Sequence, residues 1–396
     1  MHTADWHLGC SMGAEKRFEE YDALLAHLCS IIRDMNIEAV IIAGDVFDVY
    51  QPPNRAAEQY YRFLLEAGRA GAREIIVTGG NHDSAAYLEA PGKILEFLSV
   101  HVFASASRDP ADMIVELRDS SGVPAALVAA IPYLHEGDIV AVEGGSGAME
   151  REKVLKGAML KYYSRTAEAM NNISSELPHI VTGHLFAADR GEKNTSWTGT
   201  LMSVDTAEFP ASIDYLALGH LHDARTLKSP HSTCVRYPGA PVAVSFRELD
   251  VPKSVTVIDT EDVKNICEIP LPSFQDMRRL EGCREELEKE LAAIAASADH
   301  SIWCSVENTG SYEPGLWENL NMLIRDTPVK IIVCRNRESN PAVLQRLPEE
   351  RHLADLAPAD VFKLLLQECG VNGEETEPLL EAFREIETAV AEEGNR

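Results

Sequence analysis

The sequence lacks the features that mark membrane or secreted proteins. No apolar run among its 396 residues approaches the roughly 20 residues that are needed to cross a bilayer. The N-terminus has no basic segment followed by an apolar one. The eight cysteines are scattered without a CxxC pair, which is typical of free thiols in a reducing compartment. We therefore expect a cytoplasmic protein.

Positive charge is also scarce. The chain has 36 lysines and arginines against 63 aspartates and glutamates, which gives a formal net charge of −27. A protein that binds nucleic acid unaided usually has the opposite balance. Any polyanionic substrate must therefore be held by local cations, by metal ions or by a partner subunit.

Strands and helices are expected to alternate along the first hundred residues. The apolar runs at 38–43 and 74–78 are typical of buried strands, and the amphipathic stretches at 18–35 and 52–68 predict helices. This order indicates a layered α/β arrangement. In such folds, functional groups are expected just beyond the carboxyl ends of the strands.

The rest of the chain predicts a second sheet and a separate C-terminal region. Its expected strands are 112–117, 125–130, 179–182, 214–218, 233–236, 242–246 and 254–258, with a long helix at 149–172. A proline-rich boundary near 269 separates them from charged helices and two further strands. We expect three parts: 1–269, 270–357 and a helical segment at 358–396.

Five separated segments share one design, in which a strand leads into a tight turn or loop that carries a metal-ligand type of side chain. They are Asp5-x-His7, Gly44-Asp45, Gly80-Asn81-His82-Asp83, Gly183-His184 and Gly219-His220-x-His222. Aspartate, asparagine and histidine together suit Mn²⁺, Fe²⁺ or Zn²⁺, and the absence of cysteine argues against a structural zinc site. Each segment alone is compatible with an ordinary turn, but the five together indicate one metal cluster.

The residue types favour two metal ions and phosphoryl chemistry. Two ions roughly 3.5–4 Å apart can clamp the attacking and leaving oxygens of a phosphoryl displacement and lower the pKa of a bound water. Such a pair needs a bridging anion. Asp45, which follows the expected strand at 38–43 after a single glycine, is suited to that role.

The five segments resemble those of the calcineurin-like metallophosphoesterase superfamily, and their flanks resemble its SbcD family of bacterial DNA exonuclease subunits. The matching stretches are 3–9, 44–48, 131–134, 214–222 and 237–246. The resemblance is strong over 1–260 and looser beyond. It implies an α/β fold, a two-sheet sandwich flanked by helices, with a smaller α+β C-terminal capping domain.

The resemblance also implies a role for each candidate residue. One metal ion would be bound by Asp5, His7 and His222, the other by Asn81, His184 and His220, and Asp45 would bridge them. His82 would bind the scissile phosphate and protonate the leaving 3′-oxygen. Asp83 would orient His82 by a hydrogen bond, and Asp48 would support a metal ligand from behind.

The implied function is that of a nuclease with two metal ions, most readily Mn²⁺, acting as a 3′–5′ exonuclease on duplex DNA and an endonuclease on single strands. It would serve DNA repair, recombination, replication and hairpin processing with an SbcC-type ATPase, in a heterotetramer with two copies of each subunit. The segment 358–396 would dock that ATPase, or would pack as helices on its own domain. Lys16 and Arg17 are candidates for DNA contact.

Two other functions stay open. The same metal ions could act on a small phosphodiester, such as a cyclic nucleotide, or on a phosphoprotein. The chain could also be a scaffold subunit with an inactive site. One departure from the family lies at the start, where only Met1 and His2 precede the first motif. We expect a shortened central strand there, and a translation start a few residues upstream.

Overall fold

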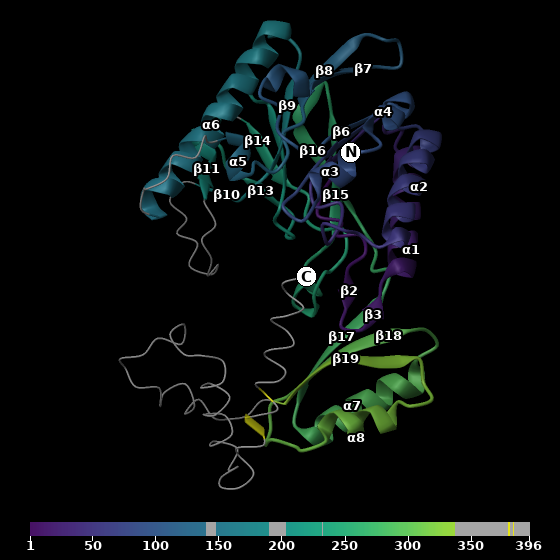
Figure 1. The fold of residues 1–396 in the computed structure, drawn as a ribbon. Coiled ribbons are helices and arrows are strands. Elements are labelled where there is room, and N and C mark those ends of the chain that lie inside the picture. Colours follow the sequence, from purple (N-terminus) through teal and green to yellow (C-terminus); the bar gives the residue numbers. More distant parts are fainter. Residues whose placement is uncertain (140–147, 190–202, 232, 337–378, 381–382, 384–396) are drawn as a thin grey trace. The chain divides into compact units, whose positions relative to one another are not determined.

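The computed structural model describes most of the chain (Figure 1). The described residues are 1–139, 148–189, 203–231, 233–336, 379–380 and 383. Nearly all of the expected C-terminal helical segment at 358–396 lies outside them. None of the helices in the described ranges has the length and apolar character that crossing a membrane requires.

The first sheet presents three of the motif-bearing strands side by side. Its order is β16 (Asp262–Pro270), β15 (Ser254–Asp259), β1 (His2–Thr3), β4 (Ala39–Ala43), β5 (Glu74–Thr78) and β6 (Val100–Phe103). Strands β1, β4, β5 and β6 are parallel, whereas β15 runs antiparallel to β1. The carboxyl ends of β1, β4 and β5 therefore meet at one edge of the sheet.

The second sheet supplies the two remaining motif strands. Its order is β13 (Arg225–Leu227), β14 (Cys234–Tyr237), β12 (Tyr215–Gly219), β9 (His179–His184), β8 (Pro124–Ala129) and β7 (Ile114–Arg118). Strands β8, β9, β12 and β14 are parallel, and β7 and β13 are antiparallel edge strands. The pairing of Gly219 with His184 puts the ends of β12 and β9 next to each other.

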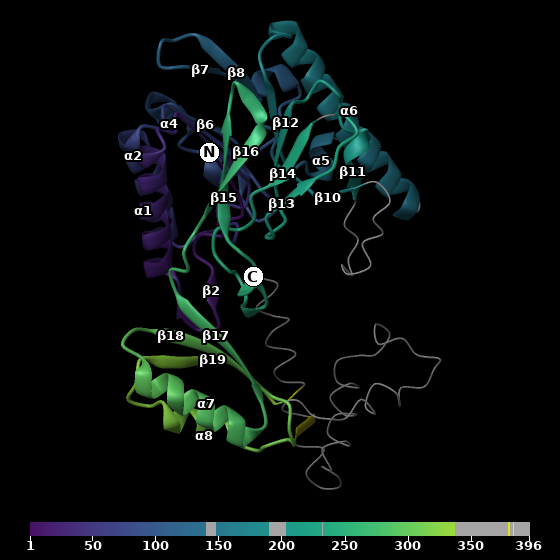
Figure 2. The same cartoon turned by 180° about the vertical axis from the view of Figure 1, so that it is seen from behind.

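The two sheets pack face to face and are covered by helices on their outer sides. Along β4, Val40 and Ile42 belong to the core under α1 (Phe18–Asp34) and α2 (Asn54–Ala70), whereas Ile41 packs between the sheets. Helix α6 (Ala148–Ile173) covers the second sheet. Figures 1 and 2 show α1 and α2 on one side of the sheets and α6 on the other. The predicted sandwich flanked by helices is confirmed.

Short elements lie in the connections between these strands and helices. They are β2 (Ser11–Met12), β3 (Glu15–Lys16), α3 (Ala85–Glu89), α4 (Gly92–Leu95), η1 (Glu96–Leu98), η2 (Pro110–Met113), α5 (Glu136–Ile139), β10 (Ala187–Ala188), β11 (Val204–Asp205), η3 (Thr206–Glu208) and η4 (Phe246–Glu248). The last of them carries a residue that contacts the candidate site.

The C-terminal region forms a smaller α+β arrangement. Strands β17 (Asp276–Gly282), β18 (Ile302–Asn308) and β19 (Val329–Asn336) make a three-stranded sheet, accompanied by α7 (Arg284–Ser297) and α8 (Leu316–Leu323). By contact density the chain divides into two units. One comprises Met1–Leu280, Glu288–Val306 and Trp317–Cys334, and the other includes Glu281–Leu287 and Glu307–Leu316. The boundaries at 269 and 357 stay predictions.

Two of the expected strands are wrong in kind or in position. Residues 242–246 form no strand; Val242 and Phe246 are buried, but in a loop that ends in η4. Residues 254–258 do form a strand, yet it pairs with β1 in the first sheet, with Thr256 opposite His2. An apolar run in the sequence predicts that the segment is buried, but it does not predict which strand the segment pairs with.

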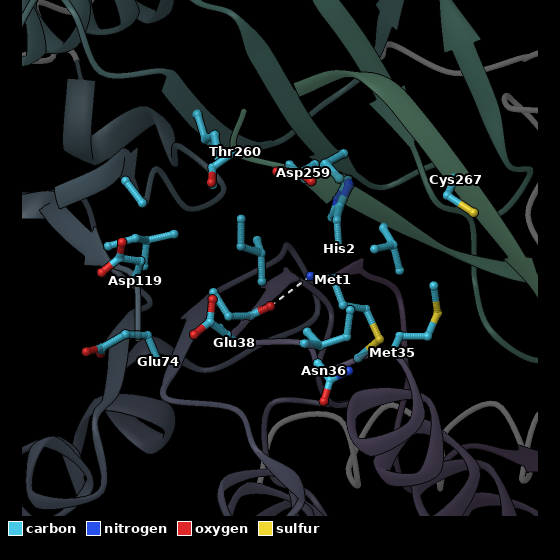
Figure 3. Close-up of a pocket in the computed structure, with 18 of the residues that line it drawn as sticks. Met1, His2, Met35, Asn36, Glu38, Glu74, Asp119, Asp259, Thr260 and Cys267 are labelled. Carbon is cyan, nitrogen blue, oxygen red and sulfur yellow. Dashed lines mark hydrogen bonds between the residues drawn. The ribbon is translucent and has the colours of Figure 1, made fainter. Parts of the chain in front are cut away.

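Strand β1 is two residues long, as expected, and a cavity lies at its start. The ammonium group of Met1 is buried and donates a hydrogen bond of 2.7 Å to the carbonyl of Ala39 (Figure 3). The cavity has a volume of about 450 Å³ and is lined by residues of both sheets and of the connections next to them, including Asp119 and Asp259. It lies at the opposite end of β1 from Asp5 and is not part of the candidate site.

Candidate metal centre

The five motifs meet where the parallel strands end. Asp5 and His7 follow β1, Asp45 follows β4, Asn81 follows β5, His184 ends β9, and His220 and His222 follow β12. Backbone hydrogen bonds continue beyond the first sheet, from the amide of Asp5 to Gly44 and from that of His7 to Asp45, both 3.0 Å. The sequence motifs are therefore neighbours in space.

Two motif glycines allow the loops to approach this closely. A Cβ atom on Gly80 would overlap the carboxylate of Asp45, and one on Gly219 would overlap the carbonyl of Ala43. Neither neighbour can move without displacing the site. These contacts give a structural reason for glycine at both positions.

The backbone of the site has unusual dihedral angles. Non-glycine residues with positive φ include Asp5 (54°), His7 (50°), Asp45 (50°) and His220 (99°), all of which are candidate ligands. Such conformations cost on the order of 1–3 kcal/mol each and persist where the surroundings hold them. Four residues with positive φ in one cluster indicate a site where the backbone is held in unfavourable conformations so that the side chains point toward one another.

One group of side chains brings together Asp5, His7 and His222. Each offers a ligand atom within 4.8 Å of the others. The two Nε2 atoms of His7 and His222 lie 3.2 Å apart and face each other. These are the three residues expected to bind the first metal ion.

A second group brings together Asn81, His184 and His220. The Oδ1 atom of Asn81 lies 3.2 Å from Nε2 of His184 and 3.1 Å from Nδ1 of His220. Asp45 lies between the two groups, because its Oδ2 atom is 3.2 Å from Nε2 of His184 and 3.7 Å from Nε2 of His7. Asp45 thus lies close to both groups, and its role as a bridging ligand stays a prediction.

The buried carboxylates of this cluster favour a positive charge at its centre. His184 directs Nδ1 at the carbonyl of Ala43 (3.0 Å), so its Nε2 faces the oxygens of Asn81 and Asp45. Burial alone would lower the pKa of His184, but Asp45 and Asp5 raise it to about 9. Burial would also raise the pKa of Asp45, which His184 and His7 hold well below its usual range. A proton on His184 therefore balances the acceptors when no metal ion is bound.

The donor set fits divalent metal ions. It consists of imidazole nitrogens, one amide oxygen and two buried carboxylates, without sulfur. Nitrogen and oxygen donors of this kind suit Mn²⁺, Fe²⁺ and Zn²⁺. The structure thus brings all seven predicted ligands into one cluster, whereas their individual roles stay predictions.

Each histidine of the first group has a carboxylate close to its Nδ1 atom, on the side of the ring away from Nε2. Asp48, as expected, has its Oδ1 atom 3.4 Å from Nδ1 of His7. Glu248, which the sequence motifs do not include, accepts a hydrogen bond of 3.2 Å from Nδ1 of His222. Burial would raise the pKa of Glu248, but the contacts with His222 and Lys253 lower it to about 2.

His82 is exposed beside the cluster and is held at two points. Its backbone amide donates to Oδ1 of Asp45 (2.9 Å), and its Nδ1 donates to the carbonyl of Asp48 (2.9 Å). The ring lies 4.9 Å from that of His7, edge to face. These contacts leave Nε2 as the nitrogen that a substrate can reach.

The expected hydrogen bond from Asp83 to His82 is wrong. The carboxylate of Asp83 is buried and instead accepts hydrogen bonds from the amides of Val46 (3.0 Å), Phe47 (2.9 Å) and Gly80 (2.9 Å). Burial and the nearby charge of Asp45 raise the pKa of Asp83 to about 6. Asp83 therefore ties together the two loops that carry Asp45 and His82, rather than the imidazole itself.

The expectation for Arg17 is also wrong. Its side chain is buried and pairs through two hydrogen bonds, 2.7 and 2.9 Å long, with the carboxylate of Glu20. It is not available for DNA. Lys16 is exposed and keeps that possibility.

Comparisons with known proteins place the chain in a family. Residues 1–224 match the model of calcineurin-like phosphoesterases, and residues 273–369 match a model described as the type 5 capsule protein repressor C-terminal domain. The SbcD component of the SbcCD nuclease of Escherichia coli K12 is 32% identical over 93% of both chains. That of Rhodobacter capsulatus is 35% identical over 71% of both. The DNA double-strand break repair protein Mre11 of Methanopyrus kandleri is 27% identical over 63% of this chain and 49% of its own.

Fold, site and family model together define a calcineurin-like metallophosphoesterase, which is a metal-dependent hydrolase. Within that class, the relatives that match most of the chain at 30% identity or more are SbcD subunits of SbcCD nucleases. The chain belongs to the SbcD family, and it is a phosphodiesterase of the nuclease type, as the sequence predicted.

Proposed function

We propose that this chain is the DNA-cleaving subunit of an SbcCD-type complex. It would act as a 3′–5′ exonuclease on double-stranded ends and as an endonuclease on single strands, in DNA repair, recombination and hairpin processing in the cytoplasm. The observation that carries the proposal is the convergence of seven donor side chains, Asp45 among them, in one cluster, with His82 exposed beside it. The relatives that match nearly the full chain are nuclease components.

The proposed ligand assignment follows the two groups in the structure. Asp5, His7 and His222 would hold one ion, Asn81, His184 and His220 the other, and Asp45 would contact both. The ions, most readily Mn²⁺, would supply a water of lowered pKa and positive charge for the phosphate oxygens. Since His184 is protonated without metal, we expect metal binding to release a proton and to weaken at low pH.

The protein's own groups would then position the substrate and handle the proton. His82 would bind the scissile phosphate through Nε2 and protonate the leaving 3′-oxygen as the bond breaks. Its Nδ1 hydrogen bond to the carbonyl of Asp48 holds the ring beside that of His7. Asp83 would act as a positioning residue, because it fixes both loops through three backbone amides.

The charge of the chain supports the need for a partner. The net charge of −27 opposes association with DNA, and phosphate contacts dominate affinity for DNA. We propose that an SbcC-type ATPase supplies most of these contacts.

An exposed apolar surface on α4 and η1 also fits an assembly. Ile94, Phe97 and Leu98 are 70%, 91% and 45% exposed, and they would be covered in a heterotetramer with two copies of each chain.

The decisive experiment is cleavage of linear DNA by the chain together with its ATPase partner. We expect Mn²⁺ to support degradation of end-labelled duplex DNA, with products that shorten from the 3′ ends, and chelation to abolish it. A cyclic nucleotide and a phosphopeptide serve as competing substrates. Turnover of either in preference to DNA would favour the small-substrate alternative, and absence of bound metal by elemental analysis would favour a scaffold.

The docking proposal for residues 358–396 is tested by deletion. Removal of the chain from Pro358 onward is expected to abolish co-purification with the ATPase, while hydrolysis of bis(p-nitrophenyl) phosphate is retained because the metal cluster lies in residues 5–222. Two helices are expected in this segment, at 358–368 and 375–393. Deletion from Gly373 onward removes only the second of them and so separates their contributions. Unchanged co-purification of the longer deletion would contradict docking there.

A further inference from the structure

Glu248 contacts a candidate metal ligand from a distant part of the chain. Its Oε1 atom accepts the hydrogen bond of 3.2 Å from Nδ1 of His222. The other nitrogen of that ring, Nε2, faces Nε2 of His7 at 3.2 Å. Because the two nitrogens lie on different sides of the imidazole, Glu248 stands behind the ring and not among the ligand atoms.

The carboxylate of Glu248 is itself fixed in position. Its Oε2 atom accepts hydrogen bonds from Nζ of Lys253 (2.9 Å) and from the amide of Val244 (3.3 Å), and the hydroxyl of Ser245 approaches Oε1 at 3.5 Å. The side chains of Glu248 and Lys253 are only 15% and 11% exposed. An exposed ion pair would contribute little order, but a partly buried and multiply bonded carboxylate restricts its partner.

We propose that Glu248 is a positioning residue that holds His222 in the tautomer protonated at Nδ1 and directs its Nε2 lone pair into the metal cluster. A carboxylate behind a metal-bound histidine fixes the ring and raises the basicity of the ligating nitrogen. The inference rests on the proposed metal-binding role of His222 and adds to it the residue that sets this role.

The same arrangement recurs at the neighbouring ligand. Nδ1 of His7 has Oδ1 of Asp48 at 3.4 Å. The two histidines of the first group thus each have a carboxylate behind Nδ1, one from the loop after β4 and one from η4. Glu248 is the more buried of the two and makes the shorter contact, so its removal should have the larger effect.

The structure offers a closely matched control residue. Glu208 ends the short helix η3 as Glu248 ends η4. It pairs with Lys156 at 2.6 Å and accepts a backbone amide hydrogen bond from Asp205 at 2.9 Å, as Glu248 does with Lys253 and Val244. It contacts no candidate ligand. Glu208→Gln therefore removes a similar set of bonds without touching the cluster.

The test is titration of metal-free protein with Mn²⁺ by calorimetry. Glu248→Ala is expected to weaken one of the two binding events by about 10- to 100-fold and to leave the other within twofold. Glu248→Gln keeps the shape and one acceptor oxygen, and should lie between Glu248→Ala and the wild type. Glu208→Gln should match the wild type. Equal Mn²⁺ affinities in the wild type and both Glu248 variants would overturn the proposal.

A second readout does not require metal or DNA. In protein with ¹⁵N-labelled histidine, the His222 signals, assigned by comparison with His222→Gln, should report protonation at Nδ1 in the wild type and a tautomer mixture in Glu248→Gln. An unchanged tautomer would overturn the proposal even if the alanine variant fails to fold. Because both readouts omit DNA, failure of DNA cleavage would contradict the proposed function and leave this inference in place.

Discussion

Replacing Asp45 by asparagine is expected to abolish nuclease activity, with a loss of at least about 1,000-fold, by dispersing the metal cluster. Asp45 has one carboxylate oxygen, Oδ2, near an imidazole nitrogen of each group, Nε2 of His184 at 3.2 Å and Nε2 of His7 at 3.7 Å. A unit charge 4 Å away contributes about 4 kcal/mol at an effective dielectric constant of 20, which corresponds to roughly a 1,000-fold change in affinity. Calorimetric titration with Mn²⁺ and single-turnover DNA cleavage measure both losses.

The same substitution should change how the metal-free protein responds to pH. The pKa of His184 is raised to about 9 in the folded chain, above its unfolded value of 6.5. Its contribution to stability is therefore complete below pH 6.5 and is lost as the pH rises through 9. In Asp45→Asn the imidazole loses its main partner, so we expect a smaller decline in the free energy of unfolding between pH 6.5 and 9.

A matched control for this experiment is Asp22→Asn. Asp22 also accepts hydrogen bonds from basic side chains, those of Arg55 and Arg62, but it lies on α1 away from the cluster. It should leave Mn²⁺ affinity and cleavage unchanged. If Asp45→Asn bound two Mn²⁺ ions as tightly as the wild type, Asp45 would not be a ligand, and the dinuclear assignment would be wrong.

The clustering of the candidate ligands could be predicted from the sequence because each lies at the end of a strand. Asp45 and Asn81 lie beyond the ends of neighbouring parallel strands in the first sheet. His184 and His220 lie at the ends of two such strands in the second sheet, and parallel strands in one sheet end at the same edge. The glycine of each motif admits the close approach, as the contacts at Gly80 show. Whether a residue lies at the end of a strand depends on its neighbours in the sequence, so this feature can be predicted from the sequence alone.

The contacts between distant side chains could not be predicted in this way. Glu248 lies 26 residues after His222 in a loop whose apolar pattern wrongly indicates a strand, and nothing in its neighbours signals the hydrogen bond. The hydrogen bond between Asp83 and His82 is expected from the family resemblance, whereas the buried carboxylate of Asp83 accepts hydrogen bonds from three backbone amides of the two loops. Arg17 resembles an exposed charge because the sequence does not show the buried carboxylate of Glu20 facing it.

Replacing His82 by alanine should separate metal binding from proton transfer. The backbone amide that bonds Asp45 is retained in the variant, and the imidazole is not in either proposed ligand group. We expect two Mn²⁺ ions to bind with unchanged affinity. DNA cleavage should fall by about 100- to 10,000-fold, which is the usual contribution of a general acid.

The leaving group decides whether that loss reflects proton transfer. A 3′-oxygen of DNA leaves as a strong base and needs a proton, whereas p-nitrophenolate is stable as an anion and does not. His82→Ala should therefore lose less than about tenfold on bis(p-nitrophenyl) phosphate, far less than on DNA. His101→Ala, which removes an imidazole paired with Glu74 at 2.8 Å outside the site, should leave both rates unchanged. A loss of Mn²⁺ affinity in His82→Ala would make His82 a metal ligand. Equal losses of rate on the two substrates would assign His82 to phosphate binding alone, because only the effect of a proton donor depends on whether the leaving oxygen needs a proton.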